Sequence, residues 1–136
     1  MAETVFSRII AGEIPCAKVY EDEHSFAFMD AGQVNPGHVL VASRRPAETI
    51  LDLSEDEAAA LFRTAHKVAR AVQAAFEPAG LTILQANRPA GWQTVPHVHL
   101  HVLPRHDCDG VGLEWPRKGP PLDALKELAA RIHVKQ

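Results

Sequence analysis

Residues 97–102 read HVHLHV, and the way this stretch folds decides the rest of the fold. In a helix, His97 and His101 would share one face while His99 pointed away from them, and the three apolar residues would scatter around the axis. In a strand, the period of two places the three imidazoles on one face and the three apolar side chains on the other. The alternation therefore predicts a strand with one chemically active face and one face buried against a helix.

The flanking sequence predicts an α+β domain around this strand. Ser54 and Glu57 have the spacing of a capping box, in which the serine accepts a hydrogen bond from the backbone three residues on. Apolar residues then follow at spacings of three and four as far as Pro78, which predicts a long amphipathic helix. Shorter apolar runs predict strands at 17–20, 25–30, 38–43 and 81–86 beside the histidine strand at 96–103, and two shorter helices at 4–11 and 122–134.

Composition narrows the class of protein to one globular domain. The chain has 136 residues, of which 46% are hydrophobic and 23% are charged, so it has enough apolar material for one core. Its net charge of -3 includes no basic block of the kind that phosphate-backbone binding needs, so no nucleic-acid partner is expected. The N-terminal residues lack the charged start and apolar run of a signal peptide or a membrane span. We therefore expect a cytoplasmic protein that does not bind membranes, and the distant Cys16 and Cys108 form no disulfide framework.

Three outward histidines on one strand indicate a catalytic or ligand-binding face. An ordinary solvated face could use lysine or threonine equally well. Metal binding is one alternative, but His97 and His101 stand roughly 13 Å apart along a strand, so all three cannot ligate one ion. A cupin-type site needs a glutamate separated from His99 by three or four residues, and Leu103 and Pro104 occupy those places. A cupin-like metal-binding protein is therefore the weaker alternative.

Nucleophilic catalysis at phosphorus is the other alternative. A neutral imidazole attacks with one ring nitrogen while the other holds its proton on a fixed acceptor. Flanking imidazole N–H groups can neutralise the oxygens of a phosphate and assist a departing group, without a metal ion. The loop before the strand contains Gly91, Gln93 and Thr94, whose backbone and hydroxyl groups can cradle a phosphate.

The chain resembles the histidine-triad family of nucleotide-binding proteins. Residues 97–103, HVHLHVL, satisfy every place of the family's H-x-H-x-H-x-x signature, and PGHVLV lies upstream at 36–41. The resemblance covers about residues 4–106, which leaves 107–136 as a variable C-terminal segment of a single domain spanning 1–136. Residues 4–30 look like the phosphoramidase branch of the family, whereas 35–62 and 91–105 look like the branch that cleaves diadenosine polyphosphates.

The resemblance implies a fold and a reaction. The fold is a five-stranded antiparallel sheet with a long helix and shorter terminal helices, and two such sheets join in a homodimer. The reaction transfers a nucleoside monophosphate from its leaving group to the middle histidine and then to water, with a purine nucleotide as substrate and no cofactor. By position the nucleophile is His99, oriented by the backbone carbonyl of His97, with His101 and His38 as supporting imidazoles.

The resemblance also implies the binding residues. Asp30 occupies the place that binds ribose hydroxyls, and two N-terminal cysteines that hold zinc in many bacterial relatives are replaced here by Thr4 and Ser7, with Pro46 at a third ligand place. We therefore expect no zinc. An alternative within the family is a nucleotide-binding adaptor with vestigial catalysis. The remaining implied contacts are Phe6, Ile9 and Phe28 around the base, and Asn87, Gln93 and Thr94 around the phosphate.

Overall fold

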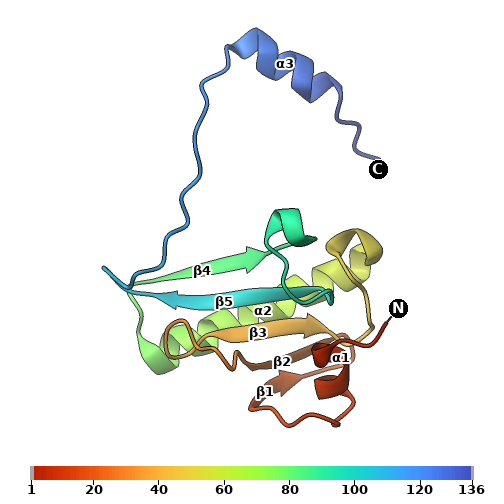
Figure 1. Cartoon of the computed structure of the whole chain (residues 1–136), viewed down its shortest axis with the longest axis vertical. Helices are drawn as coiled ribbons and strands as arrows, with labels where there is room; N and C mark the ends of the chain where they lie inside the picture. Colours follow the sequence, from red (N-terminus) through yellow and green to blue (C-terminus); the bar gives the residue numbers. More distant parts are fainter. Residues whose placement is uncertain (1, 136) are drawn as a thin grey trace.

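The computed structural model describes residues 2–135 and contains the predicted α+β architecture (Figure 1). Five antiparallel strands form one sheet in the order β1-β2-β3-β5-β4, so the strand that carries the histidines lies inside the sheet. The long helix crosses one face of the sheet, and the short N-terminal helix lies at the end of β2 and β3. The elements are α1 (Val5–Ile10), β1 (Lys18–Glu21), β2 (Ser25–Met29), β3 (Val39–Ser43), η1 (Ile50–Asp52), α2 (Glu55–Phe76), β4 (Gly80–Gln85), η2 (Pro89–Gly91), β5 (His99–Arg105) and α3 (Leu122–Ala130).

Helix α2 begins and ends where the sequence indicates. The Ser54 side chain accepts from the Glu57 backbone N–H, and the Glu57 carboxylate accepts from the Ser54 backbone N–H, which completes the predicted capping box. At the other end Glu77 adopts the left-handed conformation with φ 48° and stops the helix before Pro78. The apolar face of α2 packs on the apolar face of β5 and on Val98 just before it, and Val98, Leu100 and Val102 are all inaccessible to solvent.

The start of the histidine strand differs from the prediction. Strand β5 begins at His99, and His97 precedes it, because the backbone N–H of His97 bonds the Val95 carbonyl in a turn. Strand β5 also continues through Pro104, which was expected to end it. The ladder with β3 stops at Val102, so the missing N–H of Pro104 faces a side where no strand partner needs it.

A second, smaller apolar cluster covers the opposite face of the sheet. Phe6 of α1 packs against Phe26 and Phe28 of β2 and against Leu40 of β3. The Phe6 and Phe28 rings meet edge to face with their centroids 5.3 Å apart. This cluster holds α1 beside the histidine-bearing face of β5, so the face that carries the imidazoles also has an aromatic wall.

The C-terminal residues leave the body of the domain. An extended segment leads from the end of β5 to α3, which stands apart from the sheet (Figure 1). Leu122, Leu125 and Leu128 of α3 are each about half exposed or more. The homodimer stays a prediction; β1 and β4 are the two edge strands of the sheet. Across residues 2–135, no helix has both the length and the apolar character of a membrane span.

Candidate active site

His99 is held in one tautomer by the backbone. Its Nδ1 lies 2.6 Å from the carbonyl oxygen of His97, so Nδ1 carries the proton and donates it to that carbonyl. The lone pair of the ring is then on Nε2. The Phe6 ring meets the imidazole edge to face, with centroids 4.8 Å apart, and fixes the plane of the ring. His99 is only 5% exposed, so its position and its tautomer are both defined before any ligand arrives.

His97 lies behind His99 and faces the interior. Its side chain is fully buried, and its Nε2–H donates to the carbonyl oxygen of Ser43 at 2.7 Å, while Nδ1 has no partner. Backbone bonds tie the same two segments together, because the Val98 N–H donates to Ala47 and the Ser43 N–H donates to Val98. His97 therefore positions the carbonyl that holds His99 and does not line the cavity in front of it.

His38 and His101 form a second pair of imidazoles. The backbone N–H of Val34 donates to His38 Nδ1 at 3.4 Å, so the proton of His38 is on Nε2. His38 Nε2 lies 3.0 Å from His101 Nδ1, which leaves the proton of His101 on its own Nε2, free to donate to a ligand. The Asp30 carboxylate lies 3.6 Å from His38 Nε2.

The PGHVLV motif places this second pair. Gly37 has φ +100°, and a Cβ there would come within 2.7 Å of the Phe76 ring, so only glycine fits the turn that leads into β3. His38 enters β3 from that turn, and its neighbour on the same face, Leu40, lies directly opposite His101. The turn and the strand register together bring imidazoles 63 residues apart into contact.

Burial keeps the imidazoles neutral near neutral pH. Burial lowers the pKa of His99, and the hydrogen bond to the His97 carbonyl offsets only part of that effect. Burial also lowers the pKa of His97 and of His38. The pKa of His101 falls to about 4, because burial and then the charges of His99 and His38 oppose its protonation, while Asp30 favours it. A neutral His99 is the form that can attack an electrophile.

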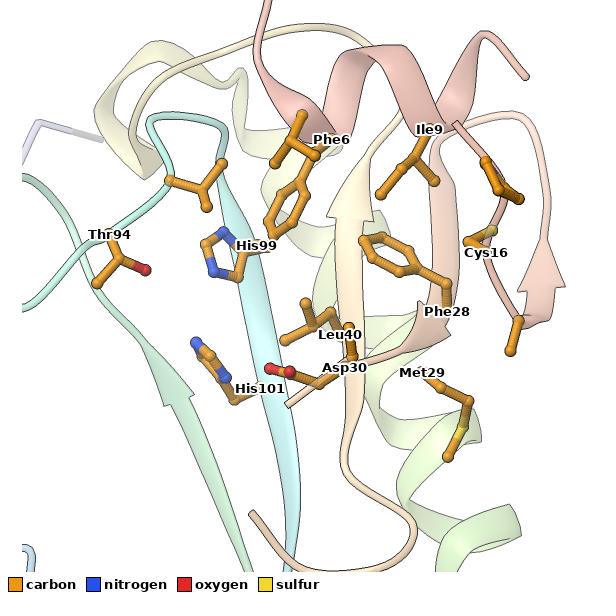
Figure 2. A pocket seen from close by; sticks show the side chains of 15 residues that line it. Phe6, Ile9, Cys16, Phe28, Met29, Asp30, Leu40, Thr94, His99 and His101 are labelled. Atoms are coloured by element: carbon orange, nitrogen blue, oxygen red, sulfur yellow. The ribbon is translucent and has the colours of Figure 1, made fainter. Parts of the chain in front are cut away.

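A cavity of about 550 Å³ opens in front of His99 (Figure 2). One end is apolar and is lined by the predicted base-pocket residues Phe6, Ile9 and Phe28. The other end is polar: the His99 and His101 rings point into it, with Asp30 on one side and Thr94 on the other. The volume of the cavity is that of a small-molecule site. Its division into an apolar end and a polar end suits a ligand with a flat apolar part joined to a polar, phosphate-like part.

Two predicted phosphate-side residues bond to other parts of the loop. Gln93 accepts from the Arg88 N–H and donates to the Glu48 carbonyl, both at 2.6 Å. Asn87 accepts from the Ile50 N–H at 2.8 Å and pairs with the Gln85 side chain. Their side chains shape the loop that carries Thr94 and do not line the cavity, so their role at a phosphate stays a prediction.

Sequence reasoning did not single out Ser43 or Leu40, which complete the site. Ser43 contributes only its backbone carbonyl. Because every residue has that group, no sequence pattern could have indicated Ser43. Leu40 could have been found, because the period of two along β3 puts it on the same face as His38.

The Asp30, His38 and His101 ligand atoms lie within 4.8 Å of one another and are the group in this site that could hold a cation. The hydrogen bond between His38 and His101 and the 3.6 Å contact between His38 Nε2 and the Asp30 carboxylate account for that proximity. In a cupin-type site, His97 and His99 would turn toward one metal ion. Here each imidazole donates to a different backbone carbonyl, so the two rings do not share a ligand position. At the zinc place of the bacterial relatives, Thr4 and Ser7 cap α1 with their hydroxyls.

The fold and the site together define an α+β protein of the histidine-triad class. Residues 11–108 match the HIT domain. A Bacillus subtilis protein called Hit is 44% identical over 112 residues, which are 82% of this chain and 77% of that relative. The adenosine 5'-monophosphoramidase of Schizosaccharomyces pombe is 32% identical over 132 residues, 96% of each chain. A crystal structure of a HIT family member from Bacillus subtilis matches with a TM-score of 0.89 at 37% identity and covers 99% of this chain and 100% of its own. The chain belongs to the HIT family.

Proposed function

We propose that the protein is a nucleotide hydrolase that works through a covalent nucleotidyl-histidine. The observation that carries the proposal is the 2.6 Å contact between His99 Nδ1 and the His97 carbonyl, because it leaves the Nε2 lone pair at the cavity. A nucleophile needs this fixed tautomer and a neutral ring. The S. pombe relative, which is named for hydrolysis of an adenosine phosphoramidate, supports the same class of reaction here.

The nucleotide is oriented by the two ends of the cavity. The base lies between Phe6, Ile9 and Phe28, and the ribose hydroxyls donate to Asp30. The α-phosphate then reaches the polar end, where the His101 Nε2–H and the Thr94 hydroxyl can donate to its oxygens. Both donors are uncharged near neutral pH, so this end of the cavity suits a single phosphate.

The reaction has two displacements at phosphorus. In the first, the bond from His99 Nε2 to phosphorus forms as the bond to the leaving group breaks, and the leaving group departs with the bonding pair and takes up a proton. In the second, water attacks phosphorus, the bond to His99 breaks, and the nucleoside monophosphate is released. The His97 carbonyl stabilises the positive charge that His99 carries in the intermediate.

The test compares His99→Ala with the matched change His24→Ala, since His24 lies in a turn with its side chain about half exposed. Wild type and both variants are given an adenosine phosphoramidate and a diadenosine polyphosphate side by side. We expect wild type and His24→Ala to turn over at least one substrate, and His99→Ala to lose at least roughly 10⁴-fold in kcat while still binding AMP. Full activity of His99→Ala contradicts the proposal. Tight AMP binding by a wild-type protein that turns over neither substrate would instead favour the adaptor alternative.

A further inference from the structure

The carboxylate of Asp109 is enclosed by hydrogen-bond donors, although it lies beyond the histidine-triad signature. Arg105 donates to it through Nε at 2.7 Å and through Nη2 at 3.1 Å. The backbone N–H groups of His106 and Val111 donate at 3.1 and 3.0 Å, and Asn35 Nδ2 donates at 3.0 Å from a turn 74 residues away in the chain. The Asp109 side chain is only 5% exposed, so these bonds are shielded from water.

Asn35 joins this carboxylate to the turn that carries His38. Its side-chain nitrogen also donates to the Pro104 carbonyl at 2.8 Å, and its backbone carbonyl accepts from the His38 N–H at 3.1 Å. Asn35 is itself buried. We call the bonded side chains of Asn35 and Asp109 the latch, because they fasten the turn before β3 to the end of β5.

His38 depends on this turn, because it lies beyond the ladder between β3 and β5. That ladder ends at the pair Val39 and Val102, so no strand pairing fixes His38 on its β5 side. Its ring must nevertheless meet His101 Nδ1 at 3.0 Å, and the contact that orients the ring comes from Val34 in the same turn. The position of the turn relative to β5 therefore sets the distance between the two imidazoles.

The latch also holds a wall beside the imidazole pair. A second cavity, of about 280 Å³, has Val111 and Leu113 in its lining together with His38 and His101. The Val111 N–H is bonded to Asp109, so the latch keeps this aliphatic wall next to the two rings. Water that entered here would compete for the bond between the imidazoles, and the wall limits that competition.

We propose that Asn35 and Asp109 are positioning residues for the reaction. Through the turn that they hold, they keep His38 bonded to His101 and so keep the His101 Nε2–H directed at the α-phosphate. This inference rests on the proposed function, because it assigns the latch to the step in which the phosphate is held. Neither residue lines either cavity, so their effect on turnover passes through His38.

The test measures turnover of an AMP amidate per folded molecule in Asn35→Ala, in Asp109→Ala and in the double variant. A misplaced donor weakens the transition state more than it weakens binding in the base pocket. We therefore expect kcat to fall by roughly tenfold or more in each single variant, while KM changes by less than about threefold. Because the two residues act as one unit, the double variant should lose little more than the more impaired single variant.

Asp22→Ala is the matched control. The Asp22 carboxylate accepts from the backbone N–H groups of His24 and Ser25, both at 2.9 Å, in the turn between β1 and β2. Its loss should lower the free energy of unfolding and leave kcat per folded molecule at the wild-type value. Asn35→Ser, which keeps a hydroxyl donor and a smaller side chain, is the milder variant if Asn35→Ala does not fold, and it should retain more of kcat than Asn35→Ala does.

The ring nitrogen chemical shifts of His38 and His101 provide a readout that a purely structural role would not change. These shifts report which nitrogen carries the proton in the nucleotide-free protein. Wild type and Asp22→Ala should have the proton on Nε2 of both rings. The latch variants should show a mixture of tautomers on His101, because His38 no longer occupies its Nδ1.

The outcomes separate this inference from the proposed function. If the latch variants lose stability but keep the wild-type kcat per folded molecule and the wild-type tautomers, the latch is only structural and the hydrolase proposal stands. An equal fall of kcat in Asp22→Ala would trace the effect to lost stability and would also overturn the inference. If wild type turns over no nucleotide, the proposed function fails and the role of the latch in turnover fails with it.

Discussion

The two pairs of imidazoles in the site are held in opposite ways. His97 and His99 each donate to a backbone carbonyl, at 2.7 and 2.6 Å, so the main chain fixes their tautomers. His38 and His101 bond to each other at 3.0 Å beside the carboxylate of Asp30, and the main chain contacts this pair only through the Val34 N–H, 3.4 Å from His38 Nδ1. The first arrangement gives one nitrogen a permanent lone pair. In the second arrangement, protonation of His38 and protonation of His101 affect each other. This coupling suits a pair whose protonation responds to the charge of a bound ligand.

The two pairs of imidazoles are suited to different roles in the reaction. A nucleophile needs one unchanging geometry, and a backbone carbonyl provides it because it does not titrate. A group that supports a phosphate needs a donor aimed at the ligand, and we propose His101 Nε2–H for this role because His38 occupies its other nitrogen. Substitutions in the second pair should therefore impair turnover, and substitutions behind the first pair should impair folding.

The largest effect after loss of the nucleophile is expected for His101→Ala. The variant removes the donor to the α-phosphate and leaves His99 and its carbonyl in place, so kcat should fall by about 10²–10³-fold. The free energy of unfolding near neutral pH should change by much less than in His97→Ala, because His101 is only half-buried. Steady-state turnover together with urea unfolding measures both quantities. A variant that unfolds readily but retains its turnover per folded molecule would reverse the roles assigned to the two pairs.

The central part of this account could be predicted from the sequence, because it depends on local patterns. The period of two in residues 97–102 predicts both the chemical face and the buried face of β5, and the buried face packs on α2 as expected. The capping box at Ser54 predicts the start of α2. The match to the family signature predicts the fold and the antiparallel sheet.

The remainder depends on partners distant in sequence. His97 lies before β5 because its own N–H bonds Val95 and because its neighbour Val98 bonds Ala47, a residue that no local pattern connects to it. The side chain of Gln93 bonds Glu48 for the same kind of reason. The wall of the second cavity depends on Asp109 meeting Asn35, which are 74 residues apart, so the signature could not indicate it.

The next largest effect is expected for His97→Ala, which tests the pair held by backbone carbonyls, His97 and His99. In His97→Ala the Ser43 carbonyl loses its buried donor and a cavity is left, so the free energy of unfolding should fall by about 3 kcal/mol. His97→Gln places an amide donor in the same region and should recover part of the stability and of the turnover. Urea unfolding of the two variants provides the measurement. Equal destabilisation by alanine and by glutamine would show that the bond to Ser43 does not hold His97 in place.

The smallest effect expected is the dependence of stability on pH. A histidine whose pKa is lowered by folding binds fewer protons in the folded chain, so stability falls as the pH drops below the unfolded pKa of about 6.5 toward the folded pKa. With the pKa of His101 at about 4, this residue alone should cost about 2 kcal/mol between about pH 7.5 and about pH 5, and His38, His97 and His99 act in the same direction.

The measurement is urea unfolding at the two pH values. The loss should be smaller by about 2 kcal/mol in His101→Ala and unchanged in Leu51→Ser, a change at a residue that is 75% exposed and does not titrate. An equal loss in His101→Ala and in wild type would mean that the second pair does not carry the coupled protonation assigned to it.

The central claim is that His99 becomes bonded to the nucleotide through Nε2. It is tested most directly by mixing the enzyme with an AMP amidate for a few milliseconds, quenching in alkaline denaturant, in which a phosphorus–nitrogen bond to imidazole survives, and mapping the nucleotidyl group by peptide mass spectrometry. The account predicts the group on His99 in wild type and in His101→Ala, and its absence in His99→Ala. A nucleotidyl group on His101 or His38, or turnover by a His99→Ala protein at the wild-type rate, would contradict it.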